Sequence, residues 1–139
     1  MLTLVEKVII LQDIDIFVNT TTEDLSYIAS ITEEMEAEEN QVIYTEGDIS
    51  DSMYVVIEGS VRLHRAGQDI MIAKSRDAFG TWALFDDEPR VTTATVLEHG
   101  ILLRLDKEDF YDLLADHSQI TQGILKTFSS RLRRLLQNL

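Results

Sequence analysis

Residues 79–90 read FGTWALFDDEPR and interrupt a region that is otherwise made of short β-type runs. Gly80 followed by Thr81–Phe85 predicts a single helical turn between two strands, and the first backbone N–H groups of such a turn have no partner within it. Arg90 follows at the entrance to the next strand. Its guanidinium could return to the glycine turn, and the two together would then hold an anion such as a phosphate.

Short β-rich runs lie on both sides of this stretch and are separated by turn signals at 46–48, 58–60, 66–68 and 98–100. Many short strands without alternating helices indicate an antiparallel sandwich or barrel. The expected strands cover residues 41–44, 53–57, 61–64, 70–73, 91–96 and 101–105.

Helical patterns occupy the two ends of the chain. Two short helices are expected over 2–11 and 22–31, the second with Thr22 as its cap. A third helix is expected from Asp106, and a last one, capped by Ser118, nearly to Leu139. We therefore predict a mainly β fold with flanking helices in one domain, 1–139, made of N-terminal helices (1–33), a β-barrel (34–106) and C-terminal helices (107–139).

The composition excludes several kinds of site. The chain has no cysteine, and its three histidines are too far apart to share an ion by local spacing, so we predict no metal site. A formal net charge of −13 disfavours unassisted binding to nucleic acid or anionic lipid, and the longest apolar run near the start is too short to cross a bilayer. A cytoplasmic protein is expected.

The order of these motifs resembles the cyclic nucleotide-binding domain family, and the resemblance covers nearly the whole chain. The matching stretches are 42–48, 53–61, Phe79-Gly80, 83–85, Pro89-Arg90 and 103–110. The resemblance implies a double-stranded β-helix, or jelly-roll, barrel with a phosphate-binding cassette and a regulatory role. It implies cAMP or cGMP as ligand and a ligand-binding set of Phe79, Gly80, Thr81, Trp82, Ala83, Arg90, Val91 and Thr92.

Thr81 stands where the family has a glutamate that accepts a hydrogen bond from the ribose 2′-hydroxyl. A neutral hydroxyl cannot replace that charged acceptor, whose loss costs about tenfold to a hundredfold in affinity. Two hypotheses remain: a regulatory domain that binds a cyclic nucleotide or a similar small anion, and a degenerate fold that serves only protein association and dimerisation. Arg90 is a ligand contact in the first, or else forms a structural salt bridge with Asp86 or Glu88. For Trp82 we favour an anchor in the core or at an interface over base stacking.

The last helix carries apolar residues at alternating spacings of three and four, which is typical of a coiled-coil seam. Members of the family dimerise through this helix, so we expect a homodimer, although packing on the chain's own barrel remains the alternative. The expected interface consists of Leu125, Phe128, Leu132, Leu135 and Leu139.

Catalysis is not expected, because the sequence has no nucleophile–base pair, metal motif or glycine-rich nucleotide-triphosphate loop. Direct DNA binding is not expected either, since no helix-turn-helix pattern follows Leu139. The chain could still be part of a larger protein.

Overall fold

The computed structural model describes residues 1–137. The chain forms two compact units, one of Met1–Ile31 together with the segment from Phe110 onward, and the other of Thr32–Asp109. The first unit is helical and the second contains the strands.

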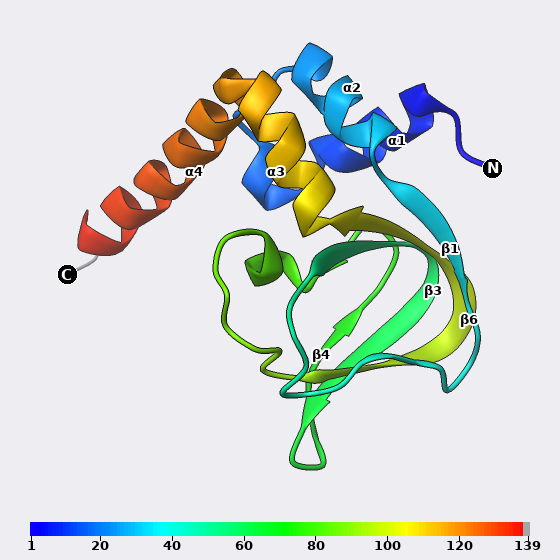
Figure 1. The fold of residues 1–139 in the computed structure, drawn as a ribbon. Coiled ribbons are helices and arrows are strands. Elements are labelled where there is room, and N and C mark those ends of the chain that lie inside the picture. The colour runs from blue at the N-terminus through cyan, green and yellow to red at the C-terminus, as the bar shows by residue number, and fades with distance from the viewer. Residues whose placement is uncertain (138–139) are drawn as a thin grey trace. The chain divides into compact units, whose positions relative to one another are not determined.

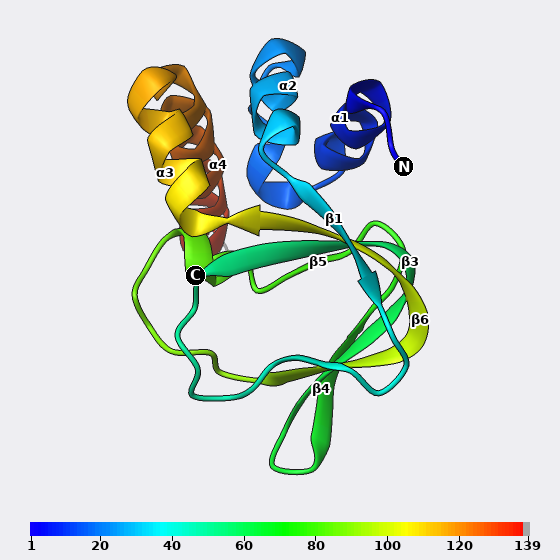
Figure 2. The ribbon, with the colours of Figure 1, turned by 45° about the vertical axis from the view of Figure 1, so that its right-hand side comes forward.

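The strand unit is an antiparallel barrel (Figure 1). Its central strands β3 and β6 pair along most of their length, with β1 beside β6 and β4 beside β3 (Figures 1 and 2). The short strand β2 also pairs with β6, and β5 pairs with β3. Every pairing is antiparallel, which confirms the prediction from the sequence. The strands are β1 (Glu33–Ala37), β2 (Val42–Tyr44), β3 (Ser52–Arg65), β4 (Gln68–Ala73), β5 (Ala78–Phe79) and β6 (Thr93–Asp106).

Two expected turns, at 58–60 and 98–100, are bends inside continuous strands. Gly59 and Gly100 meet across β3 and β6 where the register shifts, and a Cβ on Gly100 would lie 1.9 Å from the backbone oxygen of Glu58. A bulge with glycine lets two backbones approach closely while pairing continues on both sides. The expected pairs of short strands, 53–57 with 61–64 and 91–96 with 101–105, are therefore single long strands.

Two strands were not expected from the sequence. β1 has the sequence EEMEA, and only Ala37 is buried in it, so it lacks the apolar content that signals a strand. It is held by five paired positions along β6. β5 has only two residues, and its pairing with Tyr54 and Val55 places Phe79 at the start of the 79–90 stretch.

The core of the strand unit is apolar and includes three aromatic rings. Tyr54 and Phe79 stack with ring centroids 5.2 Å apart, and Tyr44 lies 6.2 Å from each. The buried residues of this cluster are Ala37, Tyr44, Tyr54, Val56, Val61, Leu63, Ala73, Phe79, Ala94, Val96 and Leu102.

The helical unit contains α1 (Leu4–Gln12), the 3-10 turn η1 (Asp15–Phe17), α2 (Thr22–Ser30) and α4 (Ser118–Gln137), and most of α3 (Lys107–Asp116). The four expected helices are present, but two caps differ by one residue. Thr21 caps α2 by accepting a hydrogen bond from the Asp24 N–H, and α4 already begins at Ser118, so the cap position is His117. Each expected cap residue instead lies at the first helical position.

One face of α4 is buried and another is exposed. Ile120, Gly123, Ile124 and Thr127 are buried. Among the residues expected at a dimer interface, Leu125, Leu132 and Leu135 are exposed and Phe128 is half-buried, whereas Leu139 lies outside the described residues. Within residues 1–137, no helix has the length and apolar composition required to cross a bilayer.

Candidate ligand-binding cavity

A cavity of about 440 Å³ opens in the strand unit beside the 79–90 stretch. All eight residues that the sequence singled out for ligand binding lie in its wall: Phe79, Gly80, Thr81, Trp82, Ala83, Arg90, Val91 and Thr92. That they bind a ligand remains a prediction. The remaining wall residues are Tyr44, Ser50, Leu63, Met71, Ala78, Asp86, Glu88 and Pro89.

The expected helical turn is present as the 3-10 turn η2 (Thr81–Leu84), which follows β5. Gly80 enters it in the left-handed region at φ 72°, and a Cβ there would lie 2.7 Å from the guanidinium nitrogen Nη1 of Arg90. Glycine is therefore required both for the backbone conformation and for the approach of Arg90. The Ala83 N–H donates to the Gly80 carbonyl at 3.2 Å, so this amide is not free to bind a ligand.

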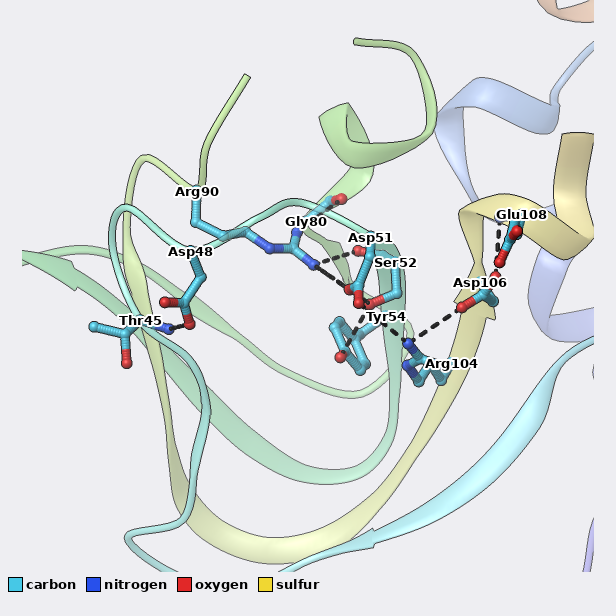
Figure 3. Close-up of polar contacts among 10 residues, drawn as sticks. All are labelled: Thr45, Asp48, Asp51, Ser52, Tyr54, Gly80, Arg90, Arg104, Asp106 and Glu108. Carbon is cyan, nitrogen blue, oxygen red and sulfur yellow. Dashed lines mark hydrogen bonds and ion pairs between the residues drawn. The ribbon is translucent and has the colours of Figure 1, made fainter. Parts of the chain in front are cut away.

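The Arg90 side chain is only 4% exposed and is held from several sides (Figure 3). Its Nη2 donates to the Ser52 carbonyl at 2.7 Å and lies 3.7 Å from an Asp51 carboxylate oxygen, while its Nη1 donates to the Gly80 carbonyl at 3.4 Å. The guanidinium carbon also lies 4.0 Å from the centroid of the Tyr44 ring, a cation–π arrangement. The Arg90 guanidinium therefore lies at the glycine turn, as the spacing between Gly80 and Arg90 predicted.

The Nε atom of Arg90 is buried without a hydrogen-bond partner in the described part of the chain. A buried donor without a partner costs free energy, so such atoms need an explanation. A guanidinium that lines a cavity and has a free N–H can donate a hydrogen bond to an anionic oxygen.

The expected salt bridge from Arg90 to Asp86 or Glu88 is wrong, because the described carboxylate paired with Arg90 is Asp51. The acids of the loop have other partners. The Asp86 carboxylate accepts a hydrogen bond from the Glu88 N–H, and Lys107 donates to the Asp86 carbonyl at 2.7 Å and to the Asp87 carboxylate at 2.8 Å. The hydrogen bond from Lys107 lowers the pKa of Asp87.

Burial raises the pKa of the Tyr44 hydroxyl, and the nearby Arg90 cation acts in the opposite direction. Tyr44 is therefore neutral at physiological pH, and its contact with the guanidinium is a cation–π contact and not an ion pair.

Trp82 is 78% exposed, so the expectation of a core anchor is wrong, while that of an anchor at an interface stays a prediction. Its neighbours Ala83 and Leu84 fill the core side of η2 and are 1% and 0% exposed. These two side chains face the core, and the Trp82 indole is left exposed at the cavity wall.

Asp51 and Ser52 were missed by the sequence reasoning. Asp51 lies between two arginines, 3.7 Å from Arg90 and 3.8 Å from Arg104 (Figure 3). Arg104 in turn pairs with Asp106 at 3.3 Å. These ion pairs could not be predicted from residue spacing, because Asp51 and Arg104 meet only through the antiparallel register of β3 and β6.

Asp106 accepts hydrogen bonds from the N–H groups of Glu108 and Asp109, and the Lys107 N–H donates to the Asp51 carbonyl at 2.9 Å. The first turn of α3 is therefore connected through Asp51 to the guanidinium that lines the cavity.

His99 is not part of the cavity wall. Its Nε2 lies 2.7 Å from Glu36 and 3.9 Å from Glu38, on the exposed side of the β1–β6 pair. The hydrogen bond with Glu36 raises the pKa of His99. An exposed pair of this kind contributes little to stability.

A family model described as "Cyclic nucleotide-binding domain" matches residues 34–117, which include the whole cavity wall. The chain belongs to the cyclic nucleotide-binding domain family. This confirms the resemblance drawn from the sequence.

Two curated relatives and one solved structure illustrate the similarity. A CRP-like cAMP-activated global transcriptional regulator of Mycobacterium tuberculosis is 28% identical over 122 residues, which cover 82% of this chain and 54% of the regulator. A cAMP-dependent protein kinase regulatory subunit of Dictyostelium discoideum is 27% identical over 137 residues, 93% of this chain and 40% of the subunit. The N-terminal domain of a transcriptional regulator from Streptomyces coelicolor A3(2) superposes with a TM-score of 0.85 at 26% identity and covers 93% of this chain and 94% of that structure.

The structural match confirms the predicted mainly β fold of the jelly-roll type with flanking helices. The chain spans about half the length of the mycobacterial relative, 54%, and less of the kinase subunit, 40%. Both relatives are regulatory proteins by name.

Proposed function

We propose that this chain is a regulatory domain without catalytic activity that senses a cyclic nucleotide, cAMP or cGMP, in the cavity at Arg90. The observation that carries the proposal is the buried Arg90 guanidinium at the glycine turn, with its Nε unpartnered in the described chain. The family match and the cAMP-related names of two relatives support the choice of ligand.

The chain of polar contacts that runs from Arg90 through Asp51, Arg104 and Asp106 to α3 supports a regulatory role. An anionic ligand on the guanidinium competes with Asp51, which also faces Arg104. A shift in Asp51 therefore alters the charge around Arg104 and Asp106, and Asp106 holds the first turn of α3. A ligand shifts the conformation of a protein only where its contacts differ between two conformations, and the contacts of Asp51 would supply that difference here.

Thermal unfolding with cAMP or cGMP tests the proposal. A ligand that binds only the native state at about 100 times its dissociation constant stabilises it by about 2.7 kcal/mol, roughly 8–10 °C for a chain of this size. In Arg90→Lys, which keeps the charge but loses the planar fork, we expect at least a tenfold loss of affinity. Arg62→Lys is the matched control, because Arg62 forms a surface ion pair with Asp69 at 3.2 Å and does not line the cavity.

Circular dichroism of the ligand-free variants shows whether Arg90→Lys folds. No stabilisation of the wild type by millimolar cAMP or cGMP would reject the proposal in favour of a domain that serves protein association alone. An undiminished response in a folded Arg90→Lys would show that the nucleotide binds elsewhere and would reject the cavity at Arg90 as its site.

We also propose that the chain forms a homodimer through α4. The support is the row of exposed leucines on this helix, Leu125, Leu132 and Leu135, which are 60%, 61% and 65% exposed. With the half-buried Phe128, these leucines lie at alternating spacings of three and four residues, which is typical of a helix that pairs with another helix.

A further inference from the structure

The cavity has a polar end and an apolar mouth. Arg90 and Gly80 form the polar end, where the guanidinium is buried. Three large apolar side chains of the wall remain exposed: Trp82 at 78%, Val91 at 63% and Met71 at 40%. They come from η2, from the residue after Arg90 and from β4, so three separate segments supply exposed apolar surface to one cavity.

Exposed apolar groups gathered at a cavity mouth usually mark a binding surface. Trp82 is the largest of them, and the buried neighbours Ala83 and Leu84 fix the turn that holds it. An indole face is well suited to stack on another flat ring, because such contacts combine apolar burial with favourable π geometry.

We propose that Trp82 is a specificity-determining residue that stacks on the flat ring of the ligand, with Met71 and Val91 beside it. The ligand class is then an anion joined to an aromatic ring system, with the anion on Arg90 and the ring at the mouth. This inference rests on the proposed function and assigns the base of the nucleotide to Trp82.

Trp82 is the only tryptophan in the sequence, so its fluorescence reports directly on this contact. Two probes separate the two ends of the cavity: cAMP, and ribose 3′,5′-cyclic phosphate, which lacks the base. We expect cAMP to quench or shift the Trp82 emission. The probe without a base should still stabilise the protein through Arg90 but leave the Trp82 emission unchanged.

Alanine substitution tests the energetic role of the ring. In Trp82→Ala we expect cAMP affinity to fall roughly 10- to 100-fold, the range associated with loss of one base–aromatic stacking contact. Affinity for the probe without a base should stay within about twofold, a smaller change than any stacking loss. Trp82→Phe should keep most of the cAMP affinity, since a flat ring remains. Because Trp82 is exposed, Trp82→Ala should fold normally.

Met71 and Ile70 offer a matched pair on β4. Both are exposed, at 40% and 56%, but only Met71 lines the cavity. Met71→Ala should weaken cAMP binding, whereas Ile70→Ala should leave it unchanged.

The outcomes separate this inference from the proposed function. If neither probe stabilises the wild type, both are overturned. If cAMP binds through Arg90 but Trp82→Ala keeps its affinity and wild-type emission does not respond, only the role of Trp82 is overturned. A Trp82 emission shift that depends on protein concentration and not on ligand would also overturn it, because the indole would then be covered by a second copy of the chain.

Discussion

At the scale of single residues, we predict that Thr81 sets the affinity of the cavity for the ribose of a nucleotide. It lies in the cavity wall one residue after Gly80 and offers a short neutral hydroxyl. A carboxylate at this position would be a longer, charged acceptor, and hydrogen bonds to charged groups are worth about 1.5–3 kcal/mol.

Thr81→Glu should therefore raise affinity for cAMP about 10- to 100-fold and leave affinity for 2′-deoxy-cAMP nearly unchanged, as measured by calorimetry. Thr81→Gln has the same length without the charge and should gain less. An equal gain for both nucleotides, or no gain for either, would show that the side chain at 81 does not reach the ribose.

At the scale of the strands, the glycine pair between β3 and β6 fixes the shape of the barrel wall. Gly59 adopts φ 87°, and its Cβ would lie 2.5 Å from the Glu98 carbonyl, so neither the conformation nor the space suits another residue. The register on the far side of this bulge pairs Ser52 with Asp106 and Tyr54 with Arg104. The bulge thus helps to place the residues that surround Arg90.

Gly100→Ala should destabilise the protein by about 3 kcal/mol or more, because its Cβ would lie 1.9 Å from a backbone oxygen and one strand would have to move. Gly67→Ala is the control. Gly67 also has a positive φ, 78°, but nothing lies within 4 Å of its Cβ, so we expect a loss of only about 1–2 kcal/mol. Chemical denaturation measures both, and equal losses would contradict the importance of the close approach.

At the scale of the whole molecule, the homodimer proposed through α4 predicts that a charge in the exposed leucine row separates the two chains. Leu132→Glu places a charge in the exposed leucine row and should dissociate a dimer into monomers, which light scattering measures. Ser130→Glu introduces the same charge on the same helix at an exposed position outside that row and should leave the dimer intact. A wild type that is monomeric at high concentration, or a dimer that survives Leu132→Glu, would rule out this interface.

Sequence patterns were sufficient to predict a mainly β fold and the glycine turn, because both depend on local signals: alternating apolar runs predict strands, and Gly80 followed by a short apolar run predicts a turn. The eight residues predicted to bind a ligand, all of which line the cavity, came from the resemblance to the family. The spacing from Gly80 to Arg90 predicted that the arginine side chain lies near the glycine turn, and its guanidinium does donate to the Gly80 carbonyl.

The tertiary structure alone decided which groups surround Arg90 and which side chain stays in water. Asp51, Ser52 and Arg104 meet through pairing between distant strands, and Gly59 and Gly100 continue two strands where isolated turns were expected. Trp82 was expected to be an anchor in the core or at an interface, but its side chain is exposed, and Ala83 and Leu84 fill the buried side of the turn. The secondary-structure propensity of a short segment does not predict which distant residues it contacts, because closure of the whole barrel sets the strand register.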